Sequence, residues 1–288
     1  MRGSVIGRGA ARRAFVCAGL WLGAGCASAP TDSVPRAEAR QALASGRSAS
    51  EQRQWKAASA AFGRAALIFA ALNESGAETA ALRDQGEALR CAGDRESAVA
   101  VYQRALELDR RLGQTQDQAR DLAGLARCAA AQQETALAIQ TAEEAIALAD
   151  AGTPLAAVLE NDLALYLLAR GDTGDPARAI ELLTSASASN QSRGDALGVA
   201  TNELNLGRAE FALGDSGLAQ SHLERALEGF RALQDPQGLA ETHEMLARFF
   251  LTRHEVEQVR FHREQARAGF EFLEDRGGLR RIESLEAQ

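Results

Sequence analysis

The four histidines of this chain, His222, His243, His254 and His262, are the first residues to test for metal binding or acid–base catalysis. His254 and His262 are eight residues apart and would share one helix face, but a rise of about 12 Å separates them too far to bind one metal ion. His243 precedes Glu244 without the second histidine, four positions on, that a zinc-protease helix needs. The spacing predicts surface or packing histidines and no metal site.

Nucleophilic catalysis by a serine is the second chemistry to consider. Residues 214–217 read Gly-Asp-Ser-Gly, the sequence around a serine-protease nucleophile. No histidine precedes His222, and no sheet scaffold for a catalytic triad is indicated. Glycine ends a helix and Asp or Ser begins the next one, so the motif predicts a turn between helices. No phosphate-binding glycine loop or nucleotide fingerprint occurs, and we expect no catalytic residue, no cofactor and no enzyme.

The amino terminus holds the cysteine for which we expect a covalent modification. Four arginines between residues 2 and 13, an apolar run at 14–24 and small residues around Cys26 indicate a secretion signal and not a spanning helix. The segment resembles a bacterial lipoprotein signal, although Gly23 stands where that family usually has Leu. The resemblance implies removal of residues 1–25, diacylglycerol on the Cys26 sulfur and acylation of the new amine. Ordinary cleavage near Ala27 or Ala29, giving a soluble secreted protein, is the alternative.

The residue after the modified cysteine bears on localisation. Ala27, and not Asp, follows Cys26, which in the lipoprotein family favours export to the outer membrane. We therefore expect a protein anchored by lipid on the periplasmic side of a bacterial outer membrane. Residues 26–35 would hold the lipidated cysteine and a short flexible tether.

The charge of the mature chain limits its partners. The full chain has 32 basic and 39 acidic side chains, and the signal removes four arginines and no carboxylate. The remaining 28 basic residues leave a net charge near −11 (28 minus 39). An acidic chain of this kind argues against nucleic acid and against a polybasic grip on anionic lipid. The membrane contact would be the lipid alone.

A period of about 40 residues governs the rest of the chain. Two columns of alanine, seven residues apart, recur at this step, which indicates one short unit stacked many times as a solenoid. The first column holds Ala58, Ala98, Ala138, Ala179 and Ala219, and the second holds Ala65, Ala105, Ala145, Ala186, Ala226 and Ala266.

The unit at residues 79–118 predicts a hairpin of two helices. Gly93 ends the first helix, and Asp94 can cap the second, which runs to about Leu112. Alanine and glycine at the crossing positions let the backbones approach closely, and Tyr102 fills the space beside them. The facing positions are Leu82, Gly86, Leu89, Ala98, Tyr102, Ala105 and Leu106.

These positions resemble the tetratricopeptide repeat, whose pattern is a small residue, a turn, Ala, an aromatic residue and Ala. The step near 40 resembles the longer-helix branch of that family, with a linking phrase between units at 193–200, 233–240 and 274–279. In the fourth unit, Pro176 fits the first helical position after an Asp cap. Other matching residues are Gly46, Phe62, Leu125, Ala126, Leu206, Gly207, Ala247 and Phe250.

The resemblance implies an all-α, right-handed α-solenoid of about six helical hairpins with a carboxy-terminal capping helix. It covers residues 36–288. The expected repeats lie near 39–78, 79–118, 119–156, 157–199, 200–239 and 240–276, with the cap at 278–288.

The remaining cysteines, Cys91 and Cys128, fall in the first helices of adjacent repeats. An oxidising compartment could join them, but buried single thiols are common. We expect free, packed thiols.

The resemblance also implies a concave groove lined by the first helix of each repeat, where a protein or peptide partner would bind. The groove positions that we expect to contact a partner are Arg83, Arg90, Arg120, Arg127, Asn161, Leu204, Arg208 and Arg248. Arginine and asparagine there would hold a peptide backbone or a carboxylate.

We therefore expect a lipid-anchored periplasmic scaffold for protein–protein interaction, in a setting such as envelope or outer-membrane assembly, pilus or secretion machinery. The alternative is a periplasmic accessory subunit that binds a small molecule or a transport substrate. Such a subunit would need a deep pocket, and Trp55 is the sole tryptophan of the mature chain that could line one.

Overall fold

The computed structural model describes residues 33–285, and within this range it has thirteen α-helices and no strand. The expected all-α fold is confirmed. None of the described helices has the length and apolar character of a membrane span. The signal sequence and Cys26 lie outside the described residues. The helices are α1 (Val34–Glu51), α2 (Trp55–Ala71), α3 (Ser75–Cys91), α4 (Arg95–Leu112), α5 (Thr115–Ala131), α6 (Thr135–Leu148), α7 (Pro154–Arg170), α8 (Asp175–Arg193), α9 (Ala196–Leu213), α10 (Ser216–Leu233), α11 (Pro236–Thr252), α12 (Val256–Phe272) and α13 (Arg276–Ser284).

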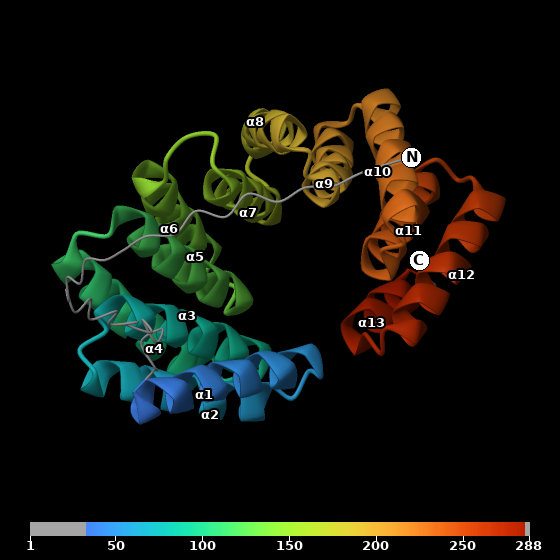
Figure 1. Ribbon diagram of the computed structural model, residues 1–288. Coiled ribbons are helices and arrows are strands. Elements are labelled where there is room, and N and C mark those ends of the chain that lie inside the picture. The colour runs from blue at the N-terminus through green and yellow to red at the C-terminus, as the bar shows by residue number, and fades with distance from the viewer. Residues whose placement is uncertain (1–32, 286–288) are drawn as a thin grey trace, which may run out of the picture. The chain divides into compact units, whose positions relative to one another are not determined.

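The helices pack as six consecutive hairpins followed by α13. Each helix packs against the next one in sequence, and the first helices of neighbouring hairpins also touch, α3 with α5, α5 with α7, α7 with α9 and α9 with α11. The first helices therefore form an inner layer, and the second helices lie outside it (Figure 1). This order is that of an α-solenoid, in which each unit buries its apolar side against its neighbours.

The two alanine columns lie at the centre of this packing. All eleven alanines of the two columns have no exposed surface. A methyl group at these positions lets the helix backbones of a hairpin approach closely, as the period of 40 residues led us to expect. The periodic core is confirmed.

Aromatic rings fill the space beside glycines of the inner helices. A Cβ at Gly46 would lie 2.5 Å from the ring of Phe62. The ring of Tyr102 lies between two glycines, because a Cβ would come within 2.9 Å of it at Gly86 and within 2.3 Å at Gly124. Glycine is therefore the residue that allows each ring to sit between two helices.

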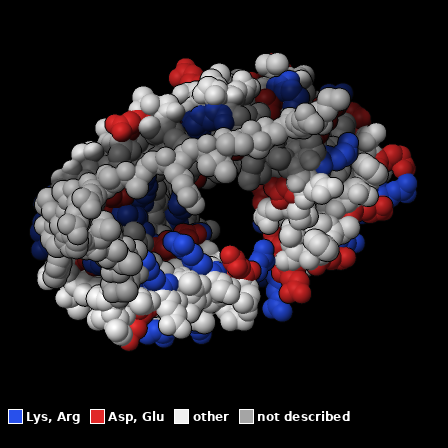
Figure 2. Space-filling model, in the orientation of Figure 1, with Lys and Arg blue, Asp and Glu red and all other residues white. Residues whose placement is uncertain are grey.

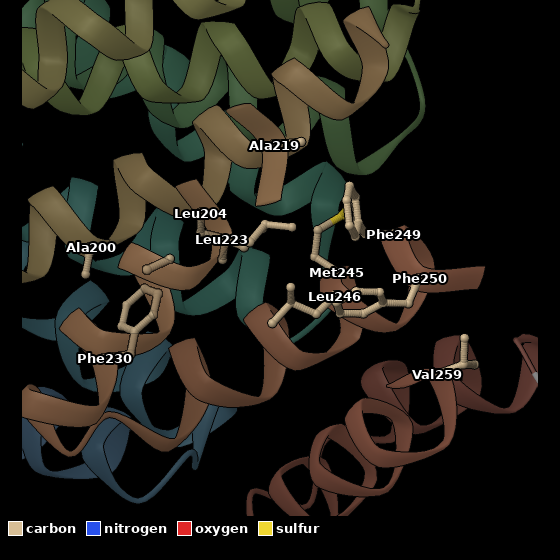
Figure 3. Packing of buried hydrophobic residues seen from close by; sticks show 11 residues of the cluster. Ala200, Leu204, Ala219, Leu223, Phe230, Met245, Leu246, Phe249, Phe250 and Val259 are labelled. Carbon is tan, nitrogen blue, oxygen red and sulfur yellow. The ribbon is translucent and has the colours of Figure 1, made fainter. Parts of the chain in front are cut away.

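The largest apolar cluster belongs to the fifth and sixth hairpins. Leu223 and Phe230 of α10 pack against Leu246 and Phe249 of α11, all of them buried (Figure 3). Leu204 of α9 is part of the same cluster and is 2% exposed.

Aspartates begin several helices in the expected way. The side chain of Asp94 accepts a hydrogen bond from the backbone N–H of Ser97, and Asp195 and Asp215 cap α9 and α10 in the same way. The hairpins begin three to five residues before the expected repeat boundaries. The reason is that the phrase expected to link the repeats forms the first turn of the next helix.

The start of α8 differs from the expectation. The helix begins at Asp175 with Gly174 as the N-cap, so Pro176 is the second helical residue and Asp175 is not the cap. The carboxylate of Asp175 instead accepts hydrogen bonds from Arg170 Nε at 2.8 Å and from the backbone N–H of Asp172 at 3.0 Å. Asp175 therefore lies one position inside the helix, after the N-cap, and its carboxylate pairs with the end of α7.

Candidate functional site

The inner helices carry the residues that the sequence assigned to a partner-binding groove. The structure places these residues on α3, α5, α7, α9 and α11, and most of their polar side chains bind another side chain of the protein. Figure 2 shows that basic and acidic side chains are interspersed around the hollow between the described helices.

Arg83 belongs to a buried charge cluster and not to an open surface. Its guanidinium lies 2.7 Å from Asp109 Oδ2, 3.0 Å from Asp117 Oδ1 and 3.5 Å from Asp121 Oδ1. Asp109 and Asp121 have no exposed surface. Burial raises the pKa of Asp121 to about 8, the charge of Arg83 opposes the rise, and that of Asp109 adds to it. Arg83 thus ties α3 to α4 and α5.

Several carboxylates of residues 33–285 are buried, although charged side chains usually lie at helix caps and on solvent-facing helix sides. Asp109, Asp121, Glu78, Glu210 and Glu244 are all at most 7% exposed. Burial is tolerated because arginines pair with several of them, as Arg104 does with Glu78 at 2.7 Å.

Arg90 forms an ion pair along its own helix. It contacts Glu87 at 2.6 Å, and the hydroxyl of Tyr102 donates to the same carboxylate at 3.3 Å. Burial acts to raise the pKa of Glu87, but the hydrogen bonds and the charge of Arg90 outweigh it and lower the pKa.

Arg120 and Arg127 both lie on α5 but differ in their partners. Arg127 bridges to the next inner helix, because its Nε and Nη2 each lie 2.9 Å from Asp162 Oδ2 on α7. Arg120 is half-exposed and pairs with Asp117 at 2.5 Å on its own helix. The first pair connects two hairpins, and the second stays at the surface.

A chain of hydrogen bonds crosses the next three inner helices. Asn205 Nδ2 donates to Asn161 Oδ1 at 2.7 Å, and Arg208 donates to Asn205 Oδ1 at 2.8 Å. Arg208 continues to Glu241 Oε2 at 3.3 Å. Two of the predicted groove residues, Asn161 on α7 and Arg208 on α9, are thereby connected to each other through Asn205 and to Glu241 on α11.

Arg248 shares its partner with the capping helix. Glu244, which is 7% exposed, accepts from Arg248 at 3.0 Å and from Arg281 of α13 at 2.9 Å. Arg281 also lies 5.4 Å from the centre of the Phe270 ring. The capping helix therefore brings a second guanidinium to the inner face, beside the predicted one.

A cavity of about 600 Å³ lies between α7, α9, α11 and α13, and we call it the C-terminal cavity. Its apolar floor comes from Leu165, Leu168, Phe211 and Met245. Its charged lining is made of three arginines and two glutamates, Arg208, Arg248, Arg281, Glu241 and Glu244. An apolar floor inside a rim with one excess positive charge suits a segment that has both apolar and acidic side chains.

The predicted groove residues lie at two different cavities, and one of them lies in the core. Arg208 and Arg248 line the C-terminal cavity, and Asn161 lies next to it through its hydrogen bond to Asn205. Arg83, Arg120 and Arg127 line a smaller cavity of about 280 Å³ over α3 and α5, and Arg90 lies on α3 near it. Leu204 is buried in the core, so its side chain reaches neither cavity.

Sequence reasoning did not assign Phe211, Met245 or Arg281 to the site. Phe211 and Met245 each lie three residues from a predicted groove position, Arg208 and Arg248, and the predicted set did not include them. Arg281 lies on the capping helix α13, which we expected only to cover the apolar surface at the end of the solenoid. No pattern in the sequence connects Arg281 to Glu244, which is 37 residues away.

The histidines also lie differently from the expectation. His254 is in the turn between α11 and α12, so it shares no helix face with His262. His262 instead contacts His243 across the two helices, Nδ1 to Nδ1 at 2.8 Å. In residues 33–285, no three His, Cys, Asp or Glu side chains converge as metal ligands.

Ser216 is the first residue of α10, and Asp215 caps that helix through the N–H of Leu218. His222 pairs with Glu203 at 2.7 Å. Cys91 and Cys128 are both free thiols.

Comparisons with known proteins connect this arrangement to solved structures. No family model and no curated protein sequence matches the chain. A Podosopora anserina protein of nearly identical TPR-like repeats superposes with a TM-score of 0.56 at 19% identity, covering 71% of this chain and 99% of the other.

Two further structures are similar over most of both chains. A Rap protein complexed with Competence and Sporulation Factor gives a TM-score of 0.63 at 15% identity, covering 86% of this chain and 80% of that protein. Pseudomonas aeruginosa pilF gives 0.56 at 18% identity, covering 81% and 92%. At such identities the likeness concerns the fold, and the chain has the α-solenoid fold of tetratricopeptide-repeat proteins.

Proposed function

We propose that this chain is a scaffold that binds a protein or peptide partner through the C-terminal cavity. The observation that carries the proposal is the combination of an apolar floor, Leu165, Leu168, Phe211 and Met245, with three arginines at its rim. The occupant would be a segment with apolar side chains and at least one carboxylate.

The arginines are held in place before the partner arrives. Arg208 is fixed by Asn205 and Glu241, and Glu244 holds both Arg248 and Arg281. These contacts use only part of the five N–H donors of each guanidinium, so further donors are available for a carboxylate. Preorganised donors reduce the entropy lost on binding, and covering the apolar floor adds a hydrophobic contribution.

The similar structures support a partner of this kind. One of them is a Rap protein in complex with another factor, and this precedent motivates a bound partner here. An open apolar floor of this size between inner helices also suits an extended segment or one helix face.

The cavity is tested with a photo-crosslinking residue at Ala212, an exposed lining position. The control is the same residue at Ala136, which is exposed on the outer helix α6. We expect a crosslinked protein from Ala212 and not from Ala136, and loss of that product in the Leu168→Glu variant. Equal products from both positions, or a product that Leu168→Glu leaves unchanged, would contradict the site.

We further propose that lipid on Cys26 anchors the scaffold to the periplasmic side of a bacterial outer membrane, where it serves envelope, pilus or secretion machinery. The basic leader, the apolar run and the small residues around Cys26 support the anchor. Several acyl chains, at about 0.8 kcal/mol per buried methylene, would make the attachment lasting. We expect Cys26→Ser to move the protein from the membrane to the soluble periplasmic fraction, and continued membrane retention would disprove the anchor.

A further inference from the structure

A second cavity lies at the other end of the described residues, and the proposed function does not use it. It has a volume of about 440 Å³ and is bounded by the last turns of α1, the first turns of α2 and the end of α3. We call it the Trp55 cavity. Its lining includes Arg47, Glu51, Trp55, Phe62, Asp84 and Glu87.

The aromatic wall of the Trp55 cavity is rigid. Phe62 is 3% exposed, and its ring lies so close to Gly46 that a Cβ there would be 2.5 Å away. Trp55 is the first residue of α2 and is half-buried. A fixed aromatic wall is typical of a site for an organic ligand.

The charged wall of the cavity is acidic. Three carboxylates, those of Glu51, Asp84 and Glu87, face one guanidinium, that of Arg47. Glu87 already accepts hydrogen bonds from Arg90 and Tyr102. With Glu87 compensated by Arg90, the carboxylates of Glu51 and Asp84 face Arg47, and the one excess negative charge disfavours phosphate or any other anion as the ligand.

Asp84 is the carboxylate that lacks a partner. It is half-buried, and within residues 33–285 it makes no hydrogen bond and no ion pair, although Arg47 and Arg83 are near enough to influence its charge. Burial is the largest influence on Asp84 and raises its pKa. A partly desolvated carboxylate without a partner is unfavourable, and a cation in the cavity would relieve that cost.

The neighbouring aromatic ring favours the same kind of ligand. Trp55 and Asp84 line the same cavity, and a cation there would gain a charged hydrogen bond from Asp84 and a cation–π contact if it also lies over the Trp55 ring. A purely apolar ligand would leave Asp84 unpaired. The volume suits an ammonium group on an alkyl chain, because the chain can lie along Phe62 and Ala88.

We propose that the Trp55 cavity binds a primary alkylammonium group, supplied by a lysine side chain of a partner protein or by a free amine. This site is separate from the C-terminal cavity, whose charged lining has an excess of arginine. Either site can fail its test without affecting the other.

Tryptophan fluorescence gives a direct test. In a Trp21→Phe background, Trp55 is the sole tryptophan of the chain. The probes are 1,5-diaminopentane and the peptide acetyl-Gly-Lys-Gly-amide, with the same peptide acetylated on the lysine nitrogen as control and the ionic strength held constant. We expect a saturable change in Trp55 emission with the amine, the lysine peptide or both, and none with the acetylated peptide. The probe that binds more tightly identifies the source of the ammonium group.

Substitutions locate the binding. We expect Asp84→Asn to weaken binding at least about tenfold, because one charged hydrogen bond is lost. Glu107→Gln, which removes an exposed carboxylate of α4, should leave it unchanged. If Asp84→Asn does not fold, as judged by circular dichroism, Glu51→Gln takes its place, with an expected weakening of about threefold.

Three results would overturn the proposal. The first is that neither probe gives a saturable change in Trp55 emission. The second is that the acetylated peptide changes the emission as much as the lysine peptide does. The third is that a folded Asp84→Asn or Glu51→Gln variant binds the probes with unchanged affinity.

Discussion

Nδ1 of His243 lies 2.8 Å from Nδ1 of His262, and the two side chains are 9% and 7% exposed. One nitrogen has to donate and the other to accept, so the accepting ring is neutral and the two rings cannot both carry a proton on Nδ1. Phe250 stacks on His262, Phe261 packs edge-on against both rings, and Arg231 is the charged group that influences His243. Within residues 33–285, no carboxylate is among the groups that shift the pKa of either ring.

This pair predicts a loss of stability in acid. Burial lowers the pKa of His243 to about 4, with smaller effects of His262 and Arg231, and burial lowers that of His262 as well. A depressed pKa gives stability that is complete above the unfolded value near 6.5 and is lost as the pH falls toward 4. We expect the pair to contribute a decline of about 3 kcal/mol to the free energy of unfolding across that window, measured by urea titration as the difference between the parent and His243→Gln, because Asp121 acts in the opposite direction over the same pH range. His243→Gln should flatten the decline, and His254→Asn, at an exposed turn, should not.

The Asp109 and Asp121 pair predicts the opposite slope at higher pH. The pKa of Asp121 is raised to about 8, so the folded state binds a proton that the unfolded chain releases near pH 4. Stability from this group is present below pH 4 and declines as the pH rises toward 8. We expect Asp121→Asn, which mimics the protonated acid, to be about 2 kcal/mol more stable than the parent at pH 8. A parent stability that does not change between pH 7 and pH 9, or an Asn variant that is less stable at pH 8, would contradict this account.

The ring of Tyr102 limits what position 124 can hold. A Cβ on Gly124 would lie 2.3 Å from the ring, so Gly124→Ala should lower the free energy of unfolding by about 2 kcal/mol. In the double variant Gly124→Ala/Tyr102→Leu the ring is absent, and most of the loss caused by the new Cβ should disappear. Gly76→Ala is the matched control, because a Cβ there meets nothing closer than 4.0 Å and should stabilise α3 by about 0.5 kcal/mol. Thermal denaturation of the four proteins distinguishes a clash from a general intolerance of alanine.

The bridge from Arg127 to Asp162 predicts coupling between the third and fourth hairpins. Burial raises the pKa of Asp162, and Arg127 opposes that rise. Arg127→Met leaves the carboxylate without its partner and should cost about 1 to 2 kcal/mol, while adding Asp162→Asn should recover part of it. A double-mutant cycle measured by denaturant unfolding gives the coupling, and a value of zero would show that the pair contributes nothing.

The sequence predicted the fold well because the fold depends on local, repeated features. Ala98 and Ala105 recur at a fixed step and have no exposed surface, and Asp94 caps the helix that it precedes. Each of these features acts within a hairpin or between neighbouring hairpins. A period in the sequence therefore translates directly into packing.

The candidate sites were less predictable, since they depend on contacts that have no period. Arg83 was assigned to a groove and lines the smaller cavity, but its guanidinium is already paired with Asp109, which is 26 residues away on an outer helix. Arg281 reaches Glu244 from the capping helix over 37 residues. Leu204 occupies a groove column of the family pattern and turns into the core. Which side chain faces outward at a given column is decided by such individual contacts.

The packing order of the helices has a mechanical consequence. The main contacts of each helix are with its neighbours one or two positions along the chain. When the two ends are pulled apart, force therefore passes through one hairpin after another. The extension record should show successive steps of similar length, each from the unravelling of one hairpin, with the later hairpins still intact while the first one gives way.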